Sequence, residues 1–131
     1  MKIVLFALIL TCTFFSIYTD TAIATESEEV ITAGDLFQAY KANSATTREK
    51  YLNRRIQIDG VVLQTYMSRY MTPNVDLSDR AGGEVMAICV LSRLDMGKLT
   101  NYTPGQTATF SGRVHAFGEN RIIIKDTKPM E

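Results

Sequence analysis

The segment Arg54–Tyr66, which reads RRIQIDGVVLQTY, constrains the fold of this chain more than any other. Ile56 and Ile58 alternate with polar residues, which is the period-2 pattern of a strand with one buried face. Gly60 interrupts the pattern, and a glycine inside a strand usually marks a bulge or a bend. Small closed barrels need long strands bent at glycine, because such a strand serves two sides of one core. The segment is therefore predicted to be the first strand of a small barrel.

The apolar run after the glycine extends the same strand. If one extra residue is inserted at Gly60, Val61 and Leu63 continue the inward face that Ile56 and Ile58 begin. We expect this register.

Four later segments carry strand patterns. The second of them is apolar on both faces and is expected to be central, and Gly112 bends the third. Residues Ser92–Tyr102 are weakly periodic and are expected to form a short helical segment between the third and fourth strands of the barrel. Mainly β structure with these five strands is the layout of an OB-fold barrel. The four segments are Asn74–Leu77, Glu84–Leu91, Gln106–Ala116 and Arg121–Asp126.

Two helices are predicted before the first strand. Thr32 followed by Asp35 is an N-cap signature, and an apolar face follows over residues 35–42. Thr46 with Glu49 repeats the signature and predicts a short second helix through residue 51.

Short runs follow one another in a recognisable order. They are DLFQAYKAN at residues 35–43, KYLNR at residues 50–54, Ile56-x-Ile58-x-Gly60-x-Val62, and Pro104-Gly105-Gln106 followed by Thr109, Phe110 and Gly112. In this order they resemble the bacterial tRNA-anti-like family of OB-fold domains over roughly residues 31–126. The resemblance implies the barrel architecture and little more. Members of that family are often secreted or lipid-anchored, and no catalytic residue can be carried over from them. Residues 66–73 depart from the family in their richness in Tyr, Met and Arg.

The first 24 residues have the pattern of a secretory signal peptide. Lys2 precedes an apolar run over residues 3–18, and Ala22-Ile23-Ala24 is an A-x-A ending suited to signal peptidase. The sixteen-residue run is shorter than the roughly 20 residues needed to span a bilayer, which disfavours a retained anchor. Cys12 follows Ile9-Leu10-Thr11, a poor sequence for lipid attachment. We expect an extracytoplasmic (periplasmic or secreted) protein with a signal peptide (1–24), a loose polar tail (25–30) and an OB-fold domain with an N-terminal helical extension (31–131).

The length, the charge and the cysteine count restrict the classes of function that this chain can have. Cleavage would leave 107 residues, enough for one domain, with 13 basic and 13 acidic side chains. This neutrality argues against a dedicated nucleic-acid binder, which normally has a basic excess. Cys89 would be the only cysteine left, so no internal disulfide is expected.

No catalytic or metal-binding pattern stands out. His115 and Cys89 offer no zinc spacing, and Asp76, Asp79 and Glu84 are interpreted as the flanks of a solvated turn. We predict no metal, no cofactor and no enzymatic activity.

The remaining candidates are surface residues. OB-folds bind ligands across strands two and three and the loops joining strands one to two and four to five. Large side chains in the predicted loops, residues 66–73 and 115–120, can stack on a polymer or contact a protein or peptide. Two functions stay open: an extracytoplasmic module that binds a protein, peptide or small polymer, and a single-stranded nucleic-acid binder. A third interpretation is that the tyrosines only plug the barrel end. The candidates are Tyr66, Arg69, Tyr70, Arg113, His115 and Phe117.

Removal of the leader gives the first testable prediction. Intact mass measurement of the secreted protein should show an N-terminus at Thr25, because cleavage follows Ala24. A mass that retains Met1, or a lipid-modified Cys12, would contradict the prediction.

Overall fold

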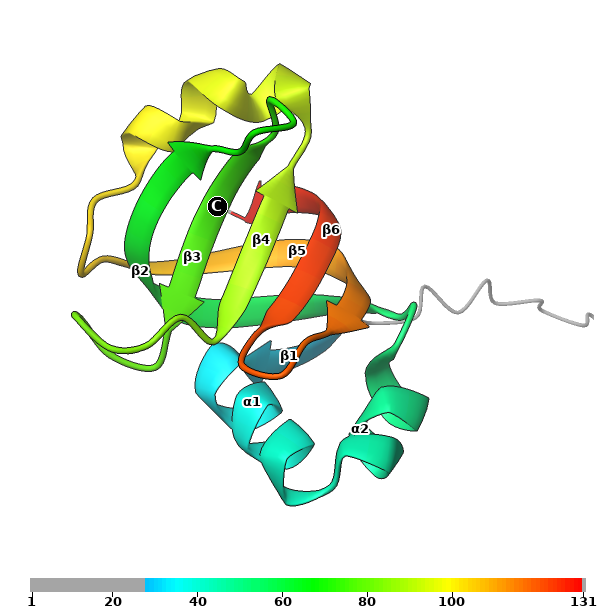
Figure 1. The fold of residues 1–131 in the computed structure, drawn as a ribbon. Helices are drawn as coiled ribbons and strands as arrows, with labels where there is room; N and C mark the ends of the chain where they lie inside the picture. Colours follow the sequence, from blue (N-terminus) through cyan, green and yellow to red (C-terminus); the bar gives the residue numbers. More distant parts are fainter. Residues whose placement is uncertain (1–27, 131) are drawn as a thin grey trace, which may run out of the picture.

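Strand β2 (Arg55–Met67) is shared by the two halves of a closed barrel. The computed structural model describes residues 28–130 (Figure 1). The N-terminal half of β2 pairs antiparallel with β5 (Thr107–Phe117), and its C-terminal half pairs antiparallel with β3 (Pro73–Ser78). The barrel is completed by β4 (Ala87–Leu91) and β6 (Ile122–Met130), which pair parallel with each other. The sheet order β2-β3-β4-β6-β5, closed by β2 against β5, confirms the predicted OB-fold.

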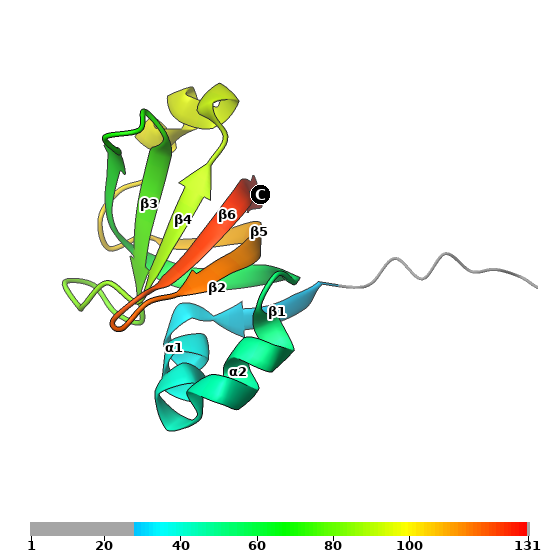
Figure 2. The same ribbon diagram turned by 45° about the vertical axis from the view of Figure 1, so that its right-hand side comes forward.

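The segment between β4 and β5 is the helical element expected from the sequence. It is a 3-10 helix, η1 (Arg93–Asn101), and the Ser92 hydroxyl accepts a hydrogen bond from the Leu94 amide at its start. Figure 2 shows η1 at one end of the barrel, opposite the end that carries the helices α1 and α2.

The core fills the barrel and continues under the first helix. Its largest fully buried side chains come from every barrel strand except β4, together with Leu36 of the helix. The short β4 contributes Ala87, Cys89 and Leu91 to the same cluster. The largest buried apolar side chains are Phe110, Leu36, Ile56, Ile58, Leu77, Ile122, Ile124, Val62, Val75 and Val114.

The predicted register at Gly60 is wrong. The inward face of β2 runs through Ile56, Ile58, Gly60 and Val62 without interruption, and the bulge follows Val62 rather than the glycine. Gly60 is itself an inward position, where a Cβ would lie 2.9 Å from the Leu77 Cβ. Because a side chain cannot fit there, the glycine allows β2 to pass close to β3.

The predicted polar tail is wrong for its last residues. Residues Glu29–Thr32 form a strand, β1, that pairs parallel with β2 at positions 56–59. Sequence patterns missed it because three of its four residues are exposed, so no alternation marks a buried face. The signal peptide and residues 25–27 lie outside the described residues.

Two helices follow β1 and cover one end of the barrel. Helix α1 (Ala33–Ala42) begins at Thr32, whose hydroxyl accepts from the Asp35 amide at 3.0 Å, as the capping signature predicts. Helix α2 (Ser44–Tyr51) begins earlier than predicted, because the Asn43 side chain, not Thr46, accepts the capping bond. Within residues 28–130, no helix is long and apolar enough to cross a membrane.

The close approaches at two glycines give a stability prediction. An added Cβ would lie 2.9 Å from Leu77 at Gly60 and 2.5 Å from Ile124 at Gly112. Gly60→Ala and Gly112→Ala should each lower the free energy of unfolding by about 1–3 kcal/mol in chemical denaturation, because the core is overpacked. Gly97→Ala in η1 is the control, since no atom lies within 4 Å of its Cβ position. Equal stability of Gly112→Ala and Gly97→Ala would contradict this account.

Candidate binding face

Strand β3 carries polar side chains on its outer side. Val75 and Leu77 point into the core, whereas Asn74, Asp76 and Ser78 alternate with them and are still at most 7% exposed. Polar groups at this depth need hydrogen-bond partners, so the surface around them must be structured.

Asp76 is the centre of that structure. Its Oδ2 accepts from Gln64 Nε2 at 2.8 Å, and its Oδ1 accepts from the Tyr66 hydroxyl at 3.2 Å. Both donors come from β2, which pairs with β3 at Gln64–Asp76 and at Tyr66–Asn74. The carboxylate therefore fixes Tyr66 on the outer face of the sheet.

The ionisation of Tyr66 follows from this position. Burial raises the pKa of the Tyr66 phenol, and the neighbouring Asp76 carboxylate acts in the same direction. Asn74 and the positive charge of Arg121 oppose the rise in pKa. The phenol is therefore neutral near pH 7 and is available as a donor to Asp76.

Apolar side chains continue the face across β4. In the sheet register Asn74 lies beside Val90, and Asp76 lies beside Ile88, which in turn lies beside Ile123 of β6. We call this surface the β3–β4 face. It is defined by Gln64, Tyr66, Asn74, Asp76, Ile88 and Val90. Gln64, Tyr66 and Val90 are accessible, whereas Asn74, Asp76 and Ile88 are at most 8% exposed.

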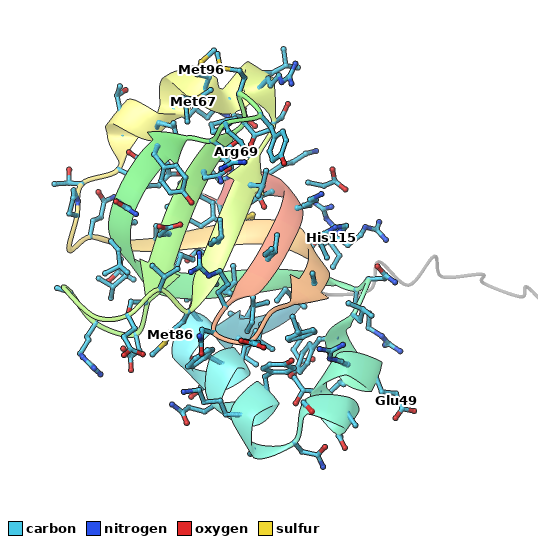
Figure 3. All side chains as sticks on the ribbon, viewed as in Figure 1. Glu49, Met67, Arg69, Met86, Met96 and His115 are labelled. Atoms are coloured by element: carbon cyan, nitrogen blue, oxygen red, sulfur yellow. The ribbon has the colours of Figure 1, made fainter. Side chains whose placement is uncertain are left out.

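A tight loop closes one end of the face. Residues 68–72 are held by the Ser68 amide donating to the Thr72 carbonyl at 2.9 Å and by the two hydroxyls at 2.6 Å. Tyr70 is 73% exposed and Met71 is 63% exposed, and Arg93 Nη2 of η1 donates to the Tyr70 carbonyl at 3.1 Å. Figure 3 shows Arg69 and Met67 at this end, near Met96 of η1. The exposure of Tyr70 does not fit the interpretation that it plugs the barrel.

Phe117 was expected at the surface, and the structure corrects this. It is 8% exposed and stacks on Tyr40 of α1, with ring centroids 4.8 Å apart. Arg48 of α2 donates to the Phe117 carbonyl at 3.3 Å and lies over the Tyr40 ring. Phe117 therefore joins the helices to the barrel.

The other two candidates lie elsewhere on the molecule. Arg113 and His115 are exposed on β5, and Arg113 donates to the Asn53 carbonyl at 3.1 Å at the end of α2. The structure thus brings only Tyr66, Arg69 and Tyr70 together at one end of the β3–β4 face. The predicted loop over residues 115–120 is shorter than expected, because β5 runs through Phe117.

Sequence reasoning missed the residue that organises the face. Asp76 was interpreted as part of a solvated turn, but it is 3% exposed within β3. The alternation of residues 74–77 was the available signal, since it places Asp76 opposite Val75 and Leu77. Burial raises the pKa of the Cys89 thiol, which lies in the core. Across the described part of the chain, no three His, Cys, Asp or Glu side chains are grouped to hold a metal ion.

Comparisons with known proteins agree with this architecture. A family model described as tRNA_anti-like matches residues 1–128. A lipoprotein from Klebsiella pneumoniae, named for a presumed binding of nucleic acid, has a similar structure (TM-score 0.64, 14% identity, covering 80% of this chain and 93% of that chain). A protein from Leishmania major, named for a presumed aspartyl-tRNA synthetase, is also similar (TM-score 0.51, 12% identity, 82% of this chain but 22% of that chain). Among curated protein sequences no match was found. At these identities the structural similarities show the fold.

The Tyr66–Asp76 contact predicts a pH dependence. The folded-state pKa of Tyr66 is raised, so its contribution to stability is present below the unfolded pKa of about 10 and is lost as pH rises through the folded value. Tyr66→Phe should therefore flatten the fall in urea midpoint above about pH 10. Tyr70→Phe is the control, because this tyrosine is 73% exposed. Identical alkaline profiles for Tyr66→Phe and Tyr70→Phe would contradict the proposed contact.

Proposed function

The chain belongs to the tRNA_anti-like family, and from this premise we propose that it is a non-enzymatic, extracytoplasmic OB-fold binding protein. Its ligand would be a protein, a peptide or a small polymer. The contact surface would be the β3–β4 face together with loop 68–72. OB-folds bind their ligands on this side of the barrel, so the fold and the proposed surface agree.

The observation that carries the proposal is the exposure of loop 68–72 beside the structured face. Tyr70 and Met71 are large side chains that are mostly exposed, and Arg69 is exposed between β2 and Tyr70. Tyr, Met and Arg are enriched at protein interfaces, because each offers a large contact area. The loop is held by four contacts between Ser68, Tyr70 and Thr72, so its ordering would cost little on binding.

The charge of the face favours a protein, peptide or neutral polymer over nucleic acid. The Asp76 carboxylate lies at the centre of the face, and the whole chain has a net charge of zero. A nucleic acid requires cations along its path, and a carboxylate beneath its bases would repel its phosphates. Single-stranded nucleic acid remains the alternative, because Arg69 and Arg121 flank the face and the Klebsiella pneumoniae lipoprotein carries that name.

The location rests on the sequence of the leader. The A-x-A ending at Ala22 and Ala24 supports export, and the described domain begins just beyond it. An extracytoplasmic partner is therefore the one to seek first.

A binding experiment on loop variants tests the proposal. The full chain is immobilised after expression with its leader, and partners are captured from the extracytoplasmic fraction of the native host. Tyr70→Ala and Arg69→Ala should change stability by no more than about 0.5 kcal/mol, since both side chains are exposed. Both should reduce partner retention about tenfold if the loop is a binding hot spot.

Two controls make the result specific. Val30→Ala removes an exposed apolar side chain of β1, away from the face, and should leave retention intact. Phe117→Ala should lower stability by about 3–5 kcal/mol, because it removes buried stacking on Tyr40. Unchanged retention in both loop variants would refute the binding face. Retention of a single-stranded oligonucleotide that falls steeply with salt would favour the alternative.

A further inference from the structure

A row of like charges crosses three strands on another side of the barrel. Arg55 of β2 lies directly beside Arg113 of β5, and Arg113 lies directly beside Lys125 of β6. Cations placed directly opposite one another on adjacent strands repel and destabilise a sheet. Negative charge nearby would therefore stabilise a row of three cations.

One carboxylate of the chain partly neutralises this row of cations. Glu28, just before β1, accepts from Arg55 Nε at 3.0 Å through one oxygen and from Ser111 Oγ at 2.7 Å through the other. The Glu28 side chain is 24% exposed, so the pair is partly shielded from solvent. This geometry shows that the surface holds an oxyanion between an arginine and a hydroxyl.

The row opens into a cleft at the end of α2. The cleft has a volume of about 880 Å³ and is lined by three arginines, one lysine and two glutamates. The Glu29 carboxylate is engaged by Lys50 Nζ at 3.4 Å and by the Tyr51 hydroxyl at 3.2 Å. Glu28 and Glu29 therefore offset two of the four cations, and Arg54 and Arg113 supply the excess.

The excess cations form no ion pair with the described carboxylates. Arg113 Nη1 is anchored by the Asn53 carbonyl at 3.1 Å, which leaves its other donors unused by that bond. Within residues 28–130, neither Arg54 nor Arg113 has a carboxylate within 4.0 Å. Arginine's planar fork matches the oxygens of phosphate and carboxylate groups, and three arginines line this cleft.

We infer that this cleft binds a compact anion bearing phosphate or carboxylate groups, in competition with the Glu28 carboxylate. The ligand would contact Arg54 and Arg113 and would take the place of Glu28 at Arg55. The cleft is lined by residues at the end of α2. Figure 1 shows α2 at the other end of the barrel from the 3-10 helix and the loop between β2 and β3. The inference is therefore independent of the proposed binding face.

Titration of the full chain with inorganic pyrophosphate tests the inference. Calorimetry should show binding to the unmodified protein. Arg54→Gln and Arg113→Gln should each weaken it about tenfold, because each removes a charge-assisted contact. Arg80→Gln is the matched control, since it removes one exposed arginine that lies outside the cleft and pairs with Asp79. No binding, or an equal loss in Arg80→Gln, would overturn the inference.

Two further variants test the competition with Glu28 and the independence of the cleft from loop 68–72. Glu28→Gln should increase pyrophosphate affinity at least about threefold, because the competing carboxylate is gone; an unchanged or lower affinity would overturn the competition. Tyr70→Ala should leave pyrophosphate binding unchanged, so that a failure of the loop surface and a failure of the cleft are distinguished.

Sedimentation with phosphatidylglycerol vesicles, compared with phosphatidylcholine vesicles, identifies the source of the anion. Arg113-dependent sedimentation with the anionic vesicles supports a lipid headgroup, and pyrophosphate binding without sedimentation supports a soluble ligand.

Discussion

The close packing of Gly60 against Leu77 is the contact on which the barrel depends. It allows one strand, β2, to pair with β5 through its first half and with β3 through its second half. The pairing of β2 with β5 closes the sheet, since β3, β4 and β6 connect these two strands around the other side. The same strand also accepts β1 as a parallel neighbour, so β2 positions three other strands. Closure removes the edges that an open sheet of this size would expose.

The two proposed surfaces follow from how β2 divides its outer side. Beyond the bulge, its outward residues Gln64 and Tyr66 face Asp76 and form the β3–β4 face. Before the glycine, its outward residue Arg55 faces Arg113 and begins the cation row. One surface therefore has a carboxylate at its centre, and the other has an excess of arginine. The net charge of zero for the whole chain conceals this separation.

The fold was predictable because its signals are local. Alternation at Ile56 and Ile58, the capping pair of Thr32 and Asp35 and the glycines in long strands each act over a few residues.

The site was predictable only in part. Tyr66 and Tyr70 lie near each other in sequence, whereas Asp76 gains its role from burial and from donors on β2. Phe117 was misplaced because a hairpin residue can pack on a helix 77 positions earlier in the chain, and no local pattern records that contact. The strand β1 was not predicted for the same reason, since only its pairing with β2 defines it as a strand.

The reactivity of the buried Cys89 thiol can report how often the barrel opens. Cys89 lies on β4 between Val75 of β3 and Ile124 of β6, where β4 and β6 pair in parallel. A thiol reacts as its thiolate, and burial disfavours that form as well as access to it. Chemical modification of the thiol therefore requires separation of β4 from its neighbouring strands, and the modification rate reports how often that separation occurs. In the form that lacks the predicted leader and its Cys12, fluctuations of the barrel can thus be followed at one atom, without a label that perturbs either surface.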